Sequence, residues 1–119
     1  SEAIVNCGYL ADARGDWKKA INFYLQALSV YPYAIDAYID LGVTYEQHKL
    51  YTLAQSVLLK GLAVAPTDGR LHVVLGQTYA DQGQTALARA QFKDAEQSDD
   101  PEVRSIAQAR IAAESSTKQ

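Results

Sequence analysis

The sequence predicts an all-α protein, a stack of three antiparallel helix hairpins closed by one further helix. Three observations support this fold class. Small residues recur every 34 positions, apolar residues within each period follow helical spacing, and the last segment carries a single apolar stripe. A chain of 119 residues fits one domain. We therefore expect one domain over residues 1–114, with hairpins at 1–34, 35–68 and 69–102, a closing helix at 101–114 and a frayed tail at 115–119.

Small residues and the larger ones between them carry the 34-residue period. The small residues with this spacing are Gly8, Gly42, Gly76, Ala20, Ala54 and Ala88. The larger residues with the same spacing are Tyr24, Leu58 and Phe92. Small side chains let the two helices of a hairpin approach closely, and the larger ones fill the space beside the crossing. One hairpin cannot bury its apolar face alone, so the three must stack to form a core.

The first hairpin is predicted to turn at Gly15, which suits the left-handed conformation that ends a helix. Asp16 is placed to cap the second helix, and Pro32 marks where that helix must stop. The apolar stripe of this second helix consists of Trp17, Ala20, Ile21, Tyr24, Ala27, Leu28 and Tyr31. We expect this stripe to face the core.

The second and third hairpins repeat this organisation. The second hairpin has one stripe on each helix, formed by Ile35, Tyr38, Gly42 and Tyr45, then by Leu53, Ala54, Val57, Leu58, Gly61 and Leu62. Pro66 ends this hairpin, and Thr67 or Asp68 can cap the next helix. Gly83 is suited to the turn of the third hairpin.

The closing helix is predicted to start at Pro101 and to present an apolar stripe to the third hairpin. The stripe consists of Val103, Ile106, Ala107 and Ile111. Arg110 stands where the crossing glycine of a further hairpin would be, which argues that no partner helix packs there. We therefore predict a capping helix that shields the end of the stack, with the aliphatic stem of Arg110 lying over apolar surface.

The second hairpin carries at fixed positions Tyr38, Leu41, Gly42, Tyr45, Ala54, Leu58, Gly61 and Pro66. This pattern, in phase across all three hairpins, resembles the tetratricopeptide repeat (TPR) family. The chain departs from the family pattern at Cys7, Ala11, His72 and Asp100. The resemblance implies a TPR solenoid, a right-handed superhelical stack whose first helices line a concave groove that binds partner segments.

The resemblance places the partner-binding positions of the groove at Val5, Asn6, Tyr9, Asp36, Ile39, Asp40, Val43, Arg70, Val73, Val74 and Gln77. Its other groove positions fall on Glu2, Asp12, Ala13, Glu46, Gln47, Ala80 and Asp81. A helical-wheel projection puts Glu46 outside the arc of its neighbours, so Glu46 is the weakest candidate. These positions are mainly acidic or apolar, with Arg70 as their one base. We predict a protein or peptide partner with basic and apolar residues.

The sequence also allows two alternative roles for its surface residues. The acids could simply be solvated, with the valines helping adjacent first helices to touch. Alternatively, Ile4, Cys7 and Leu10 form an uncovered N-terminal edge, through which the chain could form a homo-oligomer or dock within a longer array. The absence of methionine, including at position 1, suggests a fragment or a processed chain.

One known function of the family can be rejected on the residues. Its chaperone-binding members hold the acidic C-terminus of heat-shock proteins with a two-carboxylate clamp. The clamp positions fall here on Val5, Tyr9, Asp40, Arg70 and Val74. Only Arg70 fits, and Asp40 would repel the ligand.

The sequence offers no catalytic or metal-binding pattern. His48 and His72 lie 24 residues apart without a metal-ligand spacing around either. We expect His48 to be a solvated turn residue, His72 to be a partly buried structural residue, and Cys7 to be an inert small residue facing its own hairpin. An enzyme-associated domain is the alternative from another class. We predict a non-enzymatic protein without a cofactor or a metal.

Composition excludes several other classes. The net charge of −3 has the wrong sign for a general phosphate binder, and most aromatic residues occupy core positions without basic clusters beside them, so we expect no nucleic-acid partner. No apolar run is long enough to cross a membrane, and no signal segment opens this fragment. We expect a soluble chain without direct membrane insertion, and the composition favours no compartment.

Overall fold

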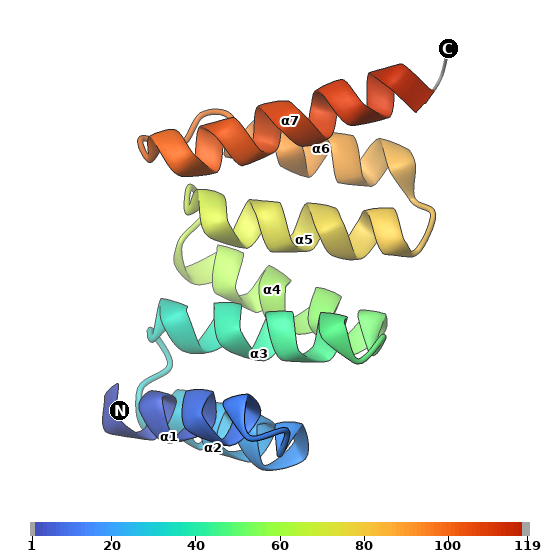
Figure 1. Cartoon of the computed structure of the whole chain (residues 1–119). Helices are drawn as coiled ribbons and strands as arrows, with labels where there is room; N and C mark the ends of the chain where they lie inside the picture. The colour runs from blue at the N-terminus through green and yellow to red at the C-terminus, as the bar shows by residue number, and fades with distance from the viewer. Residues whose placement is uncertain (1, 118–119) are drawn as a thin grey trace.

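The computed structural model describes residues 2–117 and the side chains of residues 3–114. Within this part of the chain all regular structure is helical. The helices are α1 (Glu2–Ala13), α2 (Trp17–Val30), α3 (Ile35–Gln47), α4 (Tyr51–Val64), α5 (Gly69–Asp81), α6 (Thr85–Ala95) and α7 (Pro101–Thr117). Consecutive helices form the hairpins α1–α2, α3–α4 and α5–α6, which stack in chain order with α7 at the end (Figure 1).

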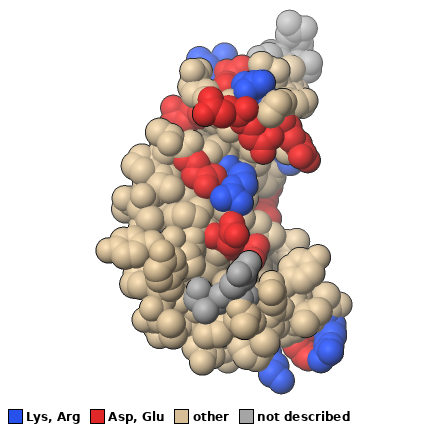
Figure 2. Space-filling model, turned by 90° about the vertical axis from the view of Figure 1, so that its left-hand side faces the viewer, with Lys and Arg blue, Asp and Glu red and all other residues tan. Residues whose placement is uncertain are grey.

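The stack has two layers. The first helices of the hairpins and α7 lie side by side on the face nearest the viewer in Figure 1, and the second helices lie behind them. Turned by 90°, the molecule has an outline that is hollowed on the side of the first helices (Figure 2). The principal extents are 45 × 27 × 21 Å. The predicted all-helical repeat solenoid is confirmed.

The crossing of each hairpin depends on its glycine. A Cβ atom placed on Gly8 would lie 2.6 Å from the Tyr24 ring. The equivalent distances are 2.6 Å from Gly42 to Leu58 and 2.7 Å from Gly76 to Phe92. Atoms this close must clash, so a larger residue would push the two helices apart. The predicted pairing of small and large residues is confirmed.

The turns inside the hairpins use the left-handed backbone conformation at equivalent positions. Gly15 has φ +86° and Gly83 has φ +77°, as predicted. Lys49 occupies the corresponding position of the second hairpin with φ 62°, which the sequence did not indicate because lysine rarely adopts this conformation. The second hairpin therefore contains a strained turn that the flanking hairpins avoid.

Helix ends follow the sequence signals in most places. α2 ends two residues before Pro32, and α4 two residues before Pro66. Asp68 caps α5 as predicted, because its side chain accepts a hydrogen bond from the Arg70 backbone N–H over 3.0 Å. Asp16 stands at the expected capping position of α2 but makes no side-chain hydrogen bond there, so its predicted role is wrong.

Tyr38 and His72 occupy equivalent positions of α3 and α5. Each forms a hydrogen bond with the proline that follows the preceding second helix. The Tyr38 hydroxyl donates to the Pro32 carbonyl over 2.8 Å, and Nε2 of His72 lies 2.9 Å from the Pro66 carbonyl. Because a carbonyl can only accept, Nε2 of His72 donates this hydrogen bond. Nδ1 lies 2.7 Å from the Gln91 side-chain amide. The prediction of a buried structural histidine is confirmed, and its departure from the family pattern preserves a hydrogen bond.

The capping helix packs as predicted along most of its stripe. Val103 and Ala107 are buried, and Ile111 packs against the core. Ile106, however, is 40% exposed, because it lies on the outer face of α7 and not beneath it. The helix also continues to Thr117, three residues beyond the predicted end at residue 114. No glycine or proline follows Pro101 to stop it. Residues 118–119 lie outside the described residues.

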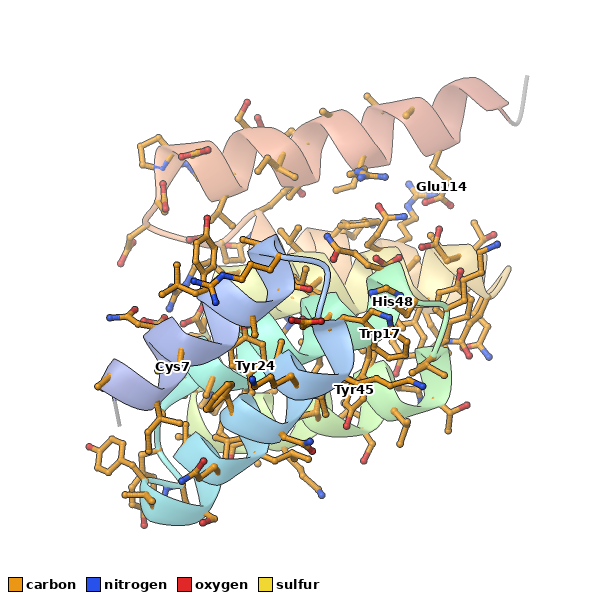
Figure 3. The ribbon with its side chains drawn as sticks, turned by 60° about the horizontal axis from the view of Figure 1, so that its bottom comes forward. Cys7, Trp17, Tyr24, Tyr45, His48 and Glu114 are labelled. Atoms are coloured by element: carbon orange, nitrogen blue, oxygen red, sulfur yellow. The ribbon has the colours of Figure 1, made fainter. Side chains whose placement is uncertain are left out.

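The N-terminal edge of the stack is open. Cys7 lines a cavity with Lys19 and Phe23 of its own hairpin, but it is exposed and not buried (Figure 3). The equivalent residues Leu41 and Leu75 are 1% and 0% exposed, because a preceding hairpin covers them. Leu10 is 54% exposed beside a cavity of about 170 Å³ that reaches Phe23. A preceding neighbour, and not the residue's own hairpin, provides burial at this position.

Two aromatic predictions also need correction. His48 is exposed but not simply solvated, because its ring stacks on Trp17 with centroids 3.9 Å apart (Figure 3). This stack joins the first hairpin to the turn of the second. Tyr31 does not continue the core stripe of α2, because the helix ends at Val30 and the extended backbone at Tyr31 leaves its side chain exposed.

Candidate partner-binding groove

The candidate site is the hollow side formed by α1, α3, α5 and α7. Neighbouring helices in this series contact each other directly. Tyr9 is the most accessible aromatic residue proposed for the groove, with 65% of its surface exposed. Asn6 is also exposed. The remaining predicted apolar and amide positions are half-buried, namely Val5, Ile39, Val43, Val73, Val74 and Gln77.

The half-buried apolar residues have a structural role as well. Val5, Ile39 and Val74 pack against the main core, and Val73 packs against the smaller core beneath α7. The alternative interpretation, in which the valines pack adjacent first helices together, is therefore partly correct. Each still keeps some surface in solvent, and exposed Tyr9 adds a large apolar body with a polar end.

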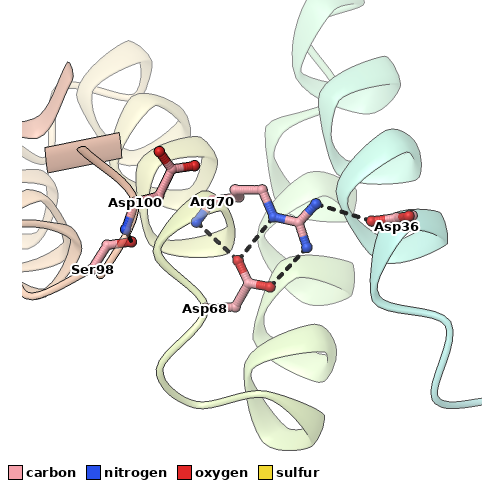
Figure 4. Close-up of polar contacts among 5 residues, drawn as sticks. All are labelled: Asp36, Asp68, Arg70, Ser98 and Asp100. Carbon is pink, nitrogen blue, oxygen red and sulfur yellow. Dashed lines mark hydrogen bonds and ion pairs between the residues drawn. The ribbon is translucent and has the colours of Figure 1, made fainter. Parts of the chain in front are cut away.

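Arg70 is engaged by carboxylates on both sides at the end of the groove where α3 and α5 begin (Figure 4). Its Nη2 lies 2.9 Å from Asp68 Oδ2, and its Nη1 lies 3.0 Å from Asp36 Oδ1 on the preceding hairpin. The hydrogen bond to Asp68 raises the pKa of Arg70. Burial alone would raise the pKa of Asp68, but its bonds to Arg70 lower it below the usual range. Two acids therefore compensate the only base proposed for the groove.

Asp40 lies deeper than the sequence suggested. It is half-buried on α3, whereas a solvated acid would be exposed. Burial first, and then the neighbouring charge of Asp36, raise the pKa of Asp40, and Arg70 offsets part of this. Burial also raises the pKa of the Tyr24 phenol, with further contributions from Asp40 and Asp12. Asp12 and Asp40 thus act electrostatically on the buried phenol of Tyr24.

A second acidic region lies where α3 and α5 end. Burial, followed by a side-chain hydrogen bond with Asp81, raises the pKa of Glu46 to about 7, and Arg110 acts in the opposite direction. Nε2 of Gln77 donates to Asp81 Oδ1 over 3.0 Å. Sequence reasoning ranked Glu46 last among the groove positions and did not connect it with Arg110. A wheel drawn for one straight helix does not show which neighbouring helices its last turn meets.

Other kinds of site receive no support from the described residues. They contain no group of three or more histidine, cysteine or acidic side chains placed to hold a metal ion. His72 is committed to Gln91 and Pro66, and His48 to its stack on Trp17. None of the helices described here is both long enough and apolar enough to span a bilayer.

Comparison with known proteins agrees with this architecture. Residues 69–100, the third hairpin and the turn after it, match the sequence model of the tetratricopeptide repeat. The chain has the TPR fold. The resemblance inferred from the 34-residue period is therefore confirmed, and the match falls on the hairpin that contains His72. No curated protein matches the chain in sequence.

Several solved TPR-like structures share the whole stack. The type III secretion translocator chaperone SycD of Yersinia enterocolitica has a TM-score of 0.90 at 15% identity, over 99% of this chain and 93% of that one. PcrH, solved with the chaperone-binding region of PopD, has a TM-score of 0.88 at 18% identity, over 99% and 92%. The N-terminal domain of stress-induced protein-1 from C. elegans has 0.77 at 21%, over 90% and 91%. At these identities the likeness concerns the fold.

Proposed function

We propose that this chain is a non-enzymatic scaffold that holds a segment of a partner protein in its concave groove. The observation that carries the proposal is a hollow surface that combines exposed Tyr9, partly exposed valines and the carboxylates of Asp12 and Asp40. Such a surface offers both apolar anchors and charge selection. PcrH, which shares the fold, was solved with a segment of another protein, and this supports the proposal.

The proposed partner segment is basic and apolar, in an extended or helical conformation. Asp68 and Asp36 already compensate Arg70, so the groove as a whole keeps a negative charge. An acidic, partly desolvated surface attracts lysine or arginine and speeds association. Apolar side chains of the segment would rest on Tyr9, Val43 and Val73. The partner-binding set proposed is that predicted from the sequence, with Asp12 added.

Peptides of opposite charge test this proposal. Lysine at Asp36 or Asp40 would disturb the structure, because Asp36 binds Arg70 and Asp40 is half-buried. We therefore choose Asp12→Asn with Asp40→Asn, which preserves shape. A basic and an acidic peptide with the same apolar residues are titrated at two salt concentrations. We expect the wild type to prefer the basic peptide, more so at low salt, and the double variant to bind it about tenfold more weakly.

The matched control removes two exposed acids outside the first helices and α7, Asp16→Asn in the first turn with Asp94→Asn on α6. This control has the same net charge as the groove variant, so any general effect of charge appears in both. Equal weakening by the two double variants, or tighter binding of the acidic peptide by the wild type, would contradict the proposal.

A second candidate function is self-association through the N-terminal edge. The observation that favours it is the exposed Leu10 beside the cavity that Cys7, Arg14, Lys19 and Phe23 help to line. Apolar surface of this kind is covered by a neighbouring hairpin elsewhere in the stack, and a second copy could provide the same cover. The two functions use different surfaces, so separate variants can test each.

A further inference from the structure

The loop between the first and second hairpins carries an exposed apolar run. Val30, Tyr31, Pro32 and Tyr33 are consecutive and exposed, and we call them the tyrosine loop. Val30 is 62% exposed, and the two tyrosines are 52% and 65% exposed. The tyrosine rings meet edge to face with their centroids 6.0 Å apart. A continuous exposed apolar run is uncommon on a soluble protein unless it serves a contact, so this loop is a candidate surface outside the groove positions.

The loop between the second and third hairpins has the same backbone hydrogen bonds without aromatic residues. The N–H and the carbonyl of Tyr31 both form loop hydrogen bonds, over 2.8 and 3.2 Å. The equivalent Ala65 forms the same two bonds over 2.8 and 3.1 Å. Thr67 stands where the first loop has Tyr33. The fold therefore does not need an aromatic residue at either position.

The tyrosine loop is also held from the side of α3. The Tyr38 hydroxyl donates to the Pro32 carbonyl, which lies between the two loop tyrosines in the chain, over 2.8 Å. A backbone fixed in this way presents its side chains with little further loss of conformational freedom on binding. Tyrosine combines a large apolar ring with a polar hydroxyl, and it is common among the residues that contribute most to binding. The pair is thus a pre-organised anchor.

Charge around the tyrosine loop indicates which partner fits. Residues 20–35 contain no lysine, arginine, aspartate or glutamate, and a broad uncharged area lies below the acidic residues in Figure 2. Asp36 follows this run directly, at the end of the groove, with its side chain 70% exposed. Asp36 and Asp68 outnumber Arg70, so this end keeps a negative charge. A matching segment is uncharged and apolar over the loop, with a lysine or arginine next to that stretch.

We propose that the tyrosine loop continues the groove as a second contact surface for the same partner segment. This inference rests on the groove binding proposed above. The lysine or arginine of the segment pairs with Asp36, and the apolar residues beside it lie on the two tyrosine rings. Arg70 stays in place, because Asp68 accepts hydrogen bonds from its Nε and Nη2 over 3.2 and 2.9 Å. The segment is extended here, since a helix would use its own carbonyls and leave none for the tyrosine hydroxyls.

The repeat itself supplies the variant that tests this contact. Tyr31→Ala with Tyr33→Thr, the loop variant, gives the first loop the residues of the second, Val-Ala-Pro-Thr. Because the second loop forms the same backbone hydrogen bonds with these residues, the urea unfolding midpoint should not change. The matched control, Leu53→Ala with Leu87→Ala, removes two exposed apolar side chains from the first turns of α4 and α6.

Three kinds of peptide are titrated, all built on the basic and apolar peptide used for the groove. The first is this groove peptide alone. The second adds an apolar extension, Leu-Val-Ser-Leu, at one end or the other, and the third adds Gly-Ser-Gly-Ser in the same places. We expect the apolar extension, at one end, to tighten binding to the wild type about tenfold, and the Gly-Ser extension to change nothing.

The variants should separate the loop from the groove. In the loop variant the gain from the apolar extension should disappear, while the groove peptide binds as it does to the wild type. The control variant should keep the whole gain. Ring signals of Tyr31 and Tyr33 in NMR spectra should shift with the apolar extension and not with the groove peptide alone.

Several outcomes would overturn the inference: no gain from the apolar extension, an equal gain from Gly-Ser, or a gain that persists in the loop variant. If the groove peptide responds to Asp12 and Asp40 as expected and the extension adds nothing, only this inference fails. If the groove peptide does not bind, the groove function fails and the inference fails with it. If the loop variant lowers the mass of the free protein in light scattering and leaves peptide binding unchanged, a second copy covers the loop and the inference is wrong.

Discussion

The two ends of the stack differ in whether their apolar surface is covered. At the C-terminal end, α7 buries Val103 and Ala107 against the third hairpin, and Ile106 is the large apolar side chain that it leaves exposed. At the N-terminal end, nothing in the described chain covers Cys7 and Leu10. Leu41, which is equivalent to Cys7 one repeat later, is almost completely buried. Residues at one register position thus have different environments at the edge and in the interior.

This difference shows that burial in a repeat stack is a property of the interface between hairpins. Within a hairpin, crossing contacts such as Gly8 with Tyr24 and Gly76 with Phe92 are nearly the same at both ends. Between hairpins, the apolar face of each first helix depends on the preceding neighbour. The predictions below therefore change the capping helix, the helix crossings and the N-terminal edge in turn.

Removal of residues 101–119 should have the largest effect, because it converts the capped end into a second open one. Deletion of α7 removes the buried contacts of Val103 and Ile111 and exposes the surface beneath them. At about 1.5–3 kcal/mol for each large aliphatic side chain, we expect the free energy of unfolding to fall by about 3–5 kcal/mol. Urea unfolding, with light scattering to detect aggregation, measures the loss.

A surface variant of the same helix provides the control for this deletion. Ile106→Ser changes an apolar residue on the outer face of α7 and should alter stability by less than about 0.5 kcal/mol. A truncated chain as stable and as monomeric as the full chain would show that α7 is not a cap.

Substitution at the helix crossings should have an intermediate effect and compares the two ends directly. Ala88 is 2% exposed in the third hairpin, and Ala20 is 0% exposed in the first. Leucine at either position overpacks a crossing, with a cost of about 1–3 kcal/mol. We expect Ala20→Leu to cost less than Ala88→Leu. In the described chain the first hairpin has a packed neighbour on one side only, so it can adjust more easily. Thermal unfolding of both variants and of Ala112→Leu, an exposed position on α7, provides the comparison.

A melting midpoint of Ala88→Leu within a degree of the wild type would contradict the crossing assignment. Equal losses at Ala20 and Ala88 would instead show that the open edge gives the first hairpin no freedom to adjust. The first result would question the packing of a hairpin, and the second would question only the comparison between ends.

The sequence was sufficient for most of what repeats, although not for the left-handed turn at Lys49. Gly42 and Leu58, or Pro32 and the end of α2, could be predicted because each feature is local and recurs in phase. The predictions failed where a residue's surroundings come from outside its own repeat. Cys7 is exposed because no hairpin of the described chain covers it, and the pKa of Glu46 depends on Asp81 of the next hairpin and on Arg110 of α7.

The candidate groove shows the same limit. The positions on the first helices follow from the period, but the sequence did not show that Asp36 and Asp68 hold Arg70 or that Asp40 is half-buried. These properties arise from the distance and angle between successive hairpins, which no single helix encodes. Residue types along a helix face therefore indicate where the groove lies, and contacts between hairpins determine which of its charges remain available.

The smallest effect on stability, and the sharpest test of the open edge, is expected from Leu10→Ser. Leu10 is 54% exposed, so the free energy of unfolding of a monomer should change by less than about 1 kcal/mol. If a second copy covers this edge, the wild type should gain mass across a tenfold rise in concentration, and the variant should not. Leu87→Ser, at a leucine 50% exposed on α6, removes the same side chain away from the edge and should leave self-association unchanged. A wild type that stays monomeric at the highest concentration, or equal loss of association in both variants, would remove the support for assembly through this edge.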